Sequence, residues 1–260
     1  MKLTNKTILI TGGTSGIGLE LAKQLLGRGN TVLVTGRDPE KLEATRQALP
    51  GVHVFQSDVS SPEAITALYE NVVAQFPALD ILINNAGIMR NLNLNQDRDL
   101  YDVTREIETN LSGPVRMVQQ FLPHLKTRKD ALIVNVSSGL AFVPLPVSPV
   151  YCATKAALHS FSQSLRAQLD GTSVTVIELA PPGVETPLFR GEFAEETKGQ
   201  KAMDVTVLAK EAIAGIEAGH LEIRPGLSNV LKTMSRVAPQ FMLSQMVKMS
   251  KPKPVKAATN

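Results

Sequence analysis

The octapeptide TGGTSGIG occupies residues 11–18, between an apolar run at residues 7–10 and a segment with helical spacing at residues 19–26. A short apolar run of this kind is typical of a buried parallel strand. A strand that turns directly into a helix needs backbone free of Cβ atoms. Such a turn aims several N–H groups and the positive end of the helix dipole at one point, which suits a phosphate. The glycines that this reading requires are Gly12, Gly16 and Gly18.

A glycine-rich turn without any ligand is the alternative reading of this stretch. The context favours the binding motif, because the glycines lie between a predicted strand and a predicted helix, as a dinucleotide-binding turn requires.

The rest of the chain continues the alternation of apolar runs and helical segments. Further strands are expected at residues 31–35, 52–55, 81–83, 131–136 and 174–179, with helices between them, among them residues 101–125 and 151–169. This rhythm predicts βαβ units and one α/β domain with a doubly wound parallel sheet of Rossmann type. Ligands of such sheets bind at the carboxyl ends of the strands. Five candidate residues each follow a predicted strand there: Gly12, Arg37, Asp58, Asn85 and Ser138.

The composition excludes several other classes of protein. The 260 residues are 43% hydrophobic and 20% charged, with a net charge of +3, so the basic surface of a nucleic-acid-binding protein is not expected. One cysteine, Cys152, allows no disulfide within the chain and fits a reducing, cytoplasmic compartment. The first apolar stretch is too short for a signal peptide, and no apolar run is long enough to span a membrane.

Tyr151 and Lys155 begin a predicted helix and lie one turn apart, on the same face. A tyrosine hydroxyl has a pKa near 10, which a neighbouring ammonium would lower toward the range useful for acid–base catalysis. Ser138, after the fifth strand, can donate a hydrogen bond to a carbonyl or alcohol oxygen. The three together could move a proton to or from that oxygen. The plainer alternative is a buried tyrosine beside a surface lysine.

The motifs TGGTSGIG, NNAG at residues 84–87, Asn110, Ser138 and YCATK at residues 151–155 together resemble the short-chain dehydrogenase/reductase family, over residues 5 to about 190. The runs SSGLAFVP and VYCATKAALHSFS are further similar to its DltE-type oxidoreductases. The resemblance implies hydride transfer between a nicotinamide and a carbonyl or secondary alcohol. It makes Tyr151 the general acid/base, and Lys155 the residue that lowers its pKa and holds the ribose. It also implies that Ser138 orients the substrate oxygen and that Asn110 holds a water of the proton relay.

The resemblance also implies a set of cofactor contacts. Val184 and Thr186 enter this set when Pro181 and Pro182 are aligned with the usual Pro-Gly pair of the family, which places a proline where a glycine is usual. The predicted cofactor-binding residues are Gly12, Thr14, Ser15, Gly16, Ile17, Gly18, Arg37, Asp58, Val59, Asn85, Ala86, Gly87, Tyr151, Lys155, Val184 and Thr186.

The end of the second strand favours NADP over NAD, although NAD stays possible. Family members that use NAD typically carry Asp at the position of Gly36, and here Arg37, a phosphate-binding side chain, comes next. Asp38 precedes Pro39 and is expected to cap the following helix, which turns its carboxylate away from the ribose.

The remaining expectations concern the substrate side and the C-terminus. We expect an oxidoreductase domain over residues 1–228 with a lid over about 187–205, an apolar helix over 229–250 packed on the domain or a partner, and a disordered tail over 251–260. A membrane-surface role is the less favoured reading of that helix. The substrate should be an apolar carbonyl or alcohol, and a homodimer or homotetramer is expected.

No metal site is predicted, since His124 and His159 lack partners in the sequence. Two other functions stay open: a nucleotide-sensing regulator without catalysis, and a lyase or epimerase on the same fold.

Overall fold

A seven-stranded parallel sheet forms the centre of the computed structural model, which describes residues 1–191, 193–194, 197, 199 and 201–250. The strand order is β3-β2-β1-β4-β5-β6-β7, with every neighbouring pair parallel. The strands are β1 (Thr7–Ile10), β2 (Thr31–Gly36), β3 (His53–Gln56), β4 (Leu79–Asn84), β5 (Ala131–Val136), β6 (Val174–Leu179) and β7 (Glu222–Ile223). The reversal of order between β1 and β4 is that of a doubly wound fold, so the predicted Rossmann-type architecture is confirmed.

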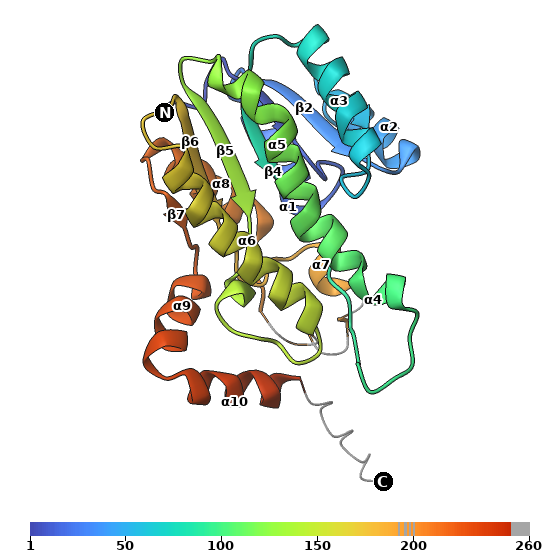
Figure 1. The fold of residues 1–260 in the computed structure, drawn as a ribbon, viewed down its shortest axis with the longest axis vertical. Coiled ribbons are helices and arrows are strands. Elements are labelled where there is room, and N and C mark those ends of the chain that lie inside the picture. The colour runs from blue at the N-terminus through green and yellow to red at the C-terminus, as the bar shows by residue number, and fades with distance from the viewer. Residues whose placement is uncertain (192, 195–196, 198, 200, 251–260) are drawn as a thin grey trace.

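Helices cover both faces of this sheet (Figure 1). They are α1 (Gly16–Leu26), α2 (Pro39–Ala48), α3 (Pro62–Gln75), α4 (Leu100–Ile107), α5 (Gly113–Lys126), α6 (Pro149–Gln168), α7 (Pro187–Arg190), α8 (Val205–Glu217), α9 (Leu227–Val237) and α10 (Pro239–Met249), with a π-helical turn η1 (Glu108–Ser112) and a 3₁₀ turn η2 (Gly139–Ala141). One buried cluster joins α1 and α8 to the sheet, and a second joins α3, α5 and α6 to its other face.

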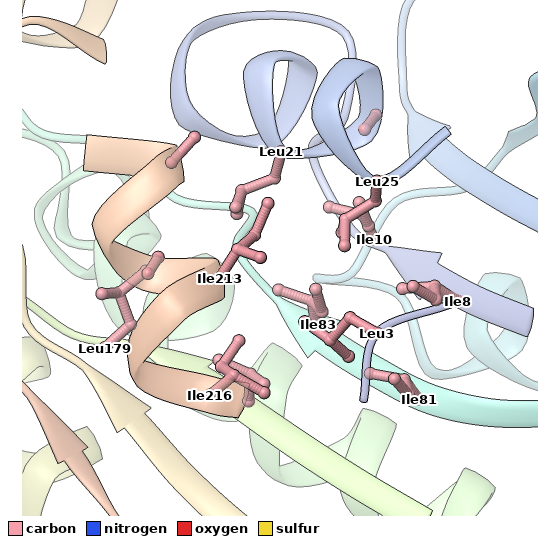
Figure 2. Close-up of a cluster of buried hydrophobic side chains, with 14 of the residues drawn as sticks. Leu3, Ile8, Ile10, Leu21, Leu25, Ile81, Ile83, Leu179, Ile213 and Ile216 are labelled. Atoms are coloured by element: carbon pink, nitrogen blue, oxygen red, sulfur yellow. The ribbon is translucent and has the colours of Figure 1, made fainter. Parts of the chain in front are cut away.

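The cluster under α1 and α8 explains why residues 7–10 form a continuous apolar run. Ile8 and Ile10 of β1 point toward Leu21 and Leu25 of α1, while Ile213 of α8 closes the layer (Figure 2). Leu9 faces the other way, into the second cluster. Since the strand is buried on both faces, alternation of apolar and polar residues is absent from it.

Two helices differ from expectation. Residues 101–125 do not form one regular helix, because the π-helical turn η1 divides α4 from α5. The prediction of a single helix over residues 229–250 is wrong, because α9 ends at Val237 and α10 begins at Pro239. A proline has no N–H to donate, and its ring disfavours helical backbone in the preceding residue, so the chain turns at Ala238. The tail at 251–260 and part of the lid lie outside the described residues.

No described helix is both long and apolar enough to cross a membrane.

Candidate active site

The turn after β1 has the conformation that its glycines allow. Gly12 and Gly16 have φ angles of +65° and +52°, in the region that favours glycine. A Cβ on Gly12 would lie 2.8 Å from Cα of Ala86, and one on Gly16 would lie 3.3 Å from the Thr186 side chain. The turn therefore forms an open cradle at the start of α1, and it fits the phosphates of a dinucleotide.

Gly18 serves the turn in a different way. A Cβ there would lie 2.4 Å from Nδ2 of Asn85 and 2.5 Å from the Gly12 carbonyl oxygen. The Asn85 amide donates to the carbonyl oxygens of Thr11 and Gly12, at 2.9 and 3.1 Å. Gly18 thus lets α1 approach the end of β4, which fixes the turn, but it does not line the cavity.

One cavity of about 780 Å³ runs from this turn across the carboxyl ends of the strands. Of the predicted site residues, only Gly18 and Asn110 are not part of its wall. Those that line it are Gly12, Thr14, Ser15, Gly16, Ile17, Arg37, Asp58, Val59, Asn85, Ala86, Gly87, Ser138, Tyr151, Lys155, Val184 and Thr186. A single site therefore brings together residues that are up to 174 positions apart, from Gly12 to Thr186.

Ser138, Tyr151 and Lys155 lie together where β5 ends and α6 begins. Ser138 caps η2, with its oxygen 3.1 Å from the N–H of Leu140. The Lys155 ammonium lies 5.6 Å from the centre of the Tyr151 ring and donates to the Val136 carbonyl oxygen at 2.9 Å. All three residues are buried, with exposures of 8%, 7% and 4%. Two hydroxyl groups and a cation thus lie together in the cavity wall with little of their surface exposed.

The pKa of Tyr151 differs from the expectation. Burial raises this pKa above its usual value, and a hydrogen bond with Ser138 lowers it only in part. Burial also lowers the pKa of the Lys155 ammonium to about 8, while the Glu178 carboxylate acts in the opposite direction. A tyrosine hydroxyl with its ordinary pKa near 10 is already protonated at neutral pH, and the raised pKa keeps Tyr151 in this form.

Asn110 lies in the π-helical turn η1 and is fully buried. Its side chain accepts from the Ile88 N–H at 2.9 Å and donates to the Ile88 carbonyl at 2.8 Å. It also donates to the Thr154 hydroxyl at 3.2 Å. A Cβ on Gly87 would lie 3.3 Å from Oδ1 of Asn110 and 3.6 Å from Nζ of Lys155, so both residues border the same space. The π-helical turn brings the Asn110 amide next to the lysine.

A buried carboxylate, Glu178, lies near Lys155 and interacts with its ammonium. Glu178 of β6 is 1% exposed, accepts a short hydrogen bond from the Ser137 hydroxyl, and lies 2.6 Å from Nδ1 of His159. His159 follows Lys155 by one turn of α6, so Glu178 faces the same side of the helix as the lysine. Its charge is the anion that supports the Lys155 ammonium.

His159, Glu178 and Glu222 bring three potential ligand atoms within 4.8 Å of one another. Both carboxylates already have partners: Ser137 for Glu178, and Arg224 and Lys232 for Glu222. No local pattern predicts this network, since it joins residues that are far apart in the chain.

The end of β2 presents cations to the cavity. Arg37 lies 3.7 Å from Asp58, and its side chain is 55% exposed. Asp38 accepts from the N–H groups of Glu40 and Lys41 at 2.9 and 3.2 Å, so it caps α2 as predicted. Lys41, which sequence reasoning missed, also lines the cavity. Its position four residues after Arg37, in the first turn of α2, was the signal that could have found it.

The matches to known proteins agree with this geometry. The family model described as short chain dehydrogenase matches residues 6–197. An uncharacterized oxidoreductase, DltE of Bacillus subtilis, is 43% identical over 95% of this chain and 98% of its own length. A fatty acyl-CoA reductase of Acinetobacter baylyi is 32% identical, over 88% of this chain and 83% of its own. A short chain dehydrogenase from Burkholderia cenocepacia, solved in complex with NADP, superposes with a TM-score of 0.82 at 25% identity, covering 95% of this chain and 99% of that one.

Proposed function

The chain belongs to the short-chain dehydrogenase family, and on that premise we propose that it is an NADP(H)-dependent oxidoreductase that acts on a carbonyl or secondary alcohol. Membership makes it an oxidoreductase with a nicotinamide cofactor. The observation that carries the finer proposal is the single cavity that joins the glycine turn to Ser138, Tyr151 and Lys155.

In this proposal the side chains divide the work around one reacting oxygen. The bound nicotinamide supplies or accepts the hydride. Ser138 donates a hydrogen bond to the substrate oxygen and fixes its position. Tyr151, which carries its proton at neutral pH, gives that proton to the substrate oxygen in the reductive direction and takes one back in the oxidative direction.

Lys155 and Asn110 act behind the tyrosine. The ammonium of Lys155 binds the cofactor ribose and favours the tyrosinate that remains after proton transfer. Asn110 holds the backbone of Ile88 and the Thr154 hydroxyl, which keeps the space beside Lys155 in a shape that a relay water can use.

The preference for NADP rests on the wall at the end of β2. Gly36 carries no acidic side chain to hold a free ribose hydroxyl, and a Cβ there would lie 2.9 Å from the Thr14 side chain, which would have to move. Arg37 and Lys41 offer two positive charges to a 2′-phosphate there. The preference rests on these side chains alone, because the Burkholderia cenocepacia structure holds NADP whereas a 3-ketoacyl-(acyl-carrier-protein) reductase from Brucella melitensis was solved with NADH.

We also expect a homodimer or homotetramer and a cytoplasmic location for an enzyme whose one cysteine is buried and free. Val115 of α5 is 37% exposed and Phe161 of α6 is partly exposed, whereas most other apolar residues of these helices pack on the sheet. Light scattering at micromolar concentration should give at least the dimer mass, and a monomer would overturn this expectation.

A panel of apolar ketones, aldehydes and secondary alcohols tests the proposal, with the absorbance of the reduced nicotinamide as the readout. Net consumption of NADPH with a carbonyl supports it. Binding of NADPH with no turnover on any substrate would indicate a nucleotide-sensing protein instead. Conversion of substrate without net change in NADPH would indicate a lyase or an epimerase.

A further inference from the structure

Helices α9 and α10 follow the part of the chain that the family model matches, and they form a wall of the active-site cavity. Leu231 of α9 and Met242, Met246 and Met249 of α10 line the same cavity as Ser138 and Tyr151. In Figure 1, α10 crosses the end of the molecule toward which the strands point. The C-terminal helices therefore face the side of the cavity where a substrate would enter.

Direct contact with the 3₁₀ turn η2, which follows Ser138, holds α9 in place. A Cβ on Gly139 would lie 2.8 Å from the Ser228 hydroxyl and 3.1 Å from the Leu231 side chain. The Ser228 side chain is fully buried, and Gly139 follows Ser138 directly. Because α9 packs on η2 at this close distance, the wall has a fixed position relative to the proton donor.

The side chains of this wall are uncharged, and most of them are apolar and flexible. Six described residues of α9 and α10 line the cavity, and none of them carries a charge. They are Leu227, Leu231, Met242, Gln245, Met246 and Met249. Leu140, Leu145 and Val147 line it from the loop before α6. Methionine side chains are unbranched and flexible, so they adapt to a ligand that is itself a flexible chain.

The three methionines follow one face of α10, at spacings of four and three residues. Met242 is half-buried, Met246 is 5% exposed and Met249 is 49% exposed, so the row is most enclosed at Met246 and opens to solvent at Met249. From residue 242 to 249 an α-helix rises roughly 10 Å, the length of an extended chain of roughly eight carbons.

We propose that α9 and α10 form the binding site for a linear aliphatic tail of the substrate, which lies along the methionine row while its carbonyl group lies at Ser138 and Tyr151. This inference rests on the proposed carbonyl chemistry and adds the substrate class. Burying one more methylene of the tail should raise kcat/KM about three- to fourfold. The rise should stop once the chain reaches the open end at Met249.

The test measures kcat/KM with NADPH for straight-chain aldehydes and 2-alkanones of four to twelve carbons. The wild-type enzyme should improve with each carbon up to a plateau. Met246→Ala should flatten this slope, with the loss confined to the longer substrates and NADPH affinity unchanged. Phe241→Ala is the matched control, because Phe241 lies on the same helix, is 55% exposed and does not line the cavity. It should keep the wild-type slope.

Met249→Lys at the mouth serves as a second variant if Met246→Ala fails to fold. It should weaken only the longest substrates. A wild-type slope that is flat from four to twelve carbons would overturn the inference and leave the carbonyl chemistry intact.

If no carbonyl is reduced at all, the proposed function is wrong. A binding measurement with a fatty-acid probe then tests the aliphatic site separately. A fluorescent undecanoic-acid derivative should bind the wild type and Phe241→Ala, and bind Met246→Ala at least threefold more weakly. Equal binding to all three proteins would contradict the site.

Discussion

Removing the charge of Arg37 should cost NADPH binding and spare NADH. The Arg37 and Lys41 side chains are 55% and 67% exposed, so water screens part of their attraction for a phosphate. A charge-assisted hydrogen bond contributes about 1.5–3 kcal/mol when well placed, and this exposure argues for the lower end of that range. Since about 1.4 kcal/mol is tenfold in affinity, Arg37→Ala should weaken NADPH binding about tenfold.

The neighbouring Asp58 adds to the effect. In the wild type it lies 3.7 Å from Arg37, and the substitution leaves its carboxylate beside the cofactor without this partner. Replacing both Arg37 and Lys41 by alanine should weaken NADPH binding by more than the roughly tenfold loss of Arg37→Ala, and the two effects need not add because both side chains would share one phosphate. NADH, which has no 2′-phosphate, should change by less than about threefold in the same variants.

Fluorescence titration of NADPH and NADH against each purified variant measures this directly, and kcat/KM for the two cofactors confirms it. Arg46→Ala is the matched control, because Arg46 lies on α2, the helix of Lys41, and pairs with Glu43 without lining the cavity. Equal weakening of NADPH and NADH by Arg37→Ala would refute the assignment of Arg37 to the phosphate. A wild type that binds both cofactors equally would refute the preference itself.

Two further predictions test residues that support the site. Glu178→Gln removes the anion that raises the Lys155 pKa, which burial already lowers to about 8. Because Lys155 acts as the ammonium, the alkaline loss of kcat should move to lower pH. An unchanged pH profile at unchanged thermal stability would show that Glu178 does not act on Lys155. Gly18→Ala places a methyl group 2.4 Å from Asn85, so about 1–3 kcal/mol of stability and most cofactor binding should be lost. The control Gly27→Ala, whose Cβ would meet nothing closer than 3.5 Å, should melt and bind NADPH like the wild type. Calorimetry and NADPH titration measure both variants, and equal behaviour of the two would contradict the packing role of Gly18.

The parallel sheet and the position of the site followed from local sequence patterns. The glycine turn, the apolar runs and the helix caps are each contained in a short stretch, as the cap at Asp38 illustrates. Parallel strands bring their carboxyl ends to one edge of the sheet. Residues such as Asp58 and Ser138 could therefore be assigned to one site from the local patterns that predict the strands.

What the sequence did not predict depends on distant partners. The raised pKa of Tyr151 follows from its burial, which no pattern around YCATK reports. Glu178 belongs to a strand, and only the packing of α6 on β6 brings it to His159. The methionines of residues 242–249 were expected in a core or an interface. Their spacing gave a helix face but not the cavity that this face borders.

The exchange of Tyr151 for phenylalanine tests the central claim most directly, because it removes the hydroxyl and keeps the buried ring. With the best carbonyl substrate, single-turnover oxidation of NADPH should slow by about 10²–10⁴-fold, the usual contribution of a general acid. NADPH affinity and melting temperature should stay close to those of the wild type. A Tyr151→Phe enzyme that binds NADPH normally and oxidises it at the wild-type rate would contradict the proposal that Tyr151 donates the proton.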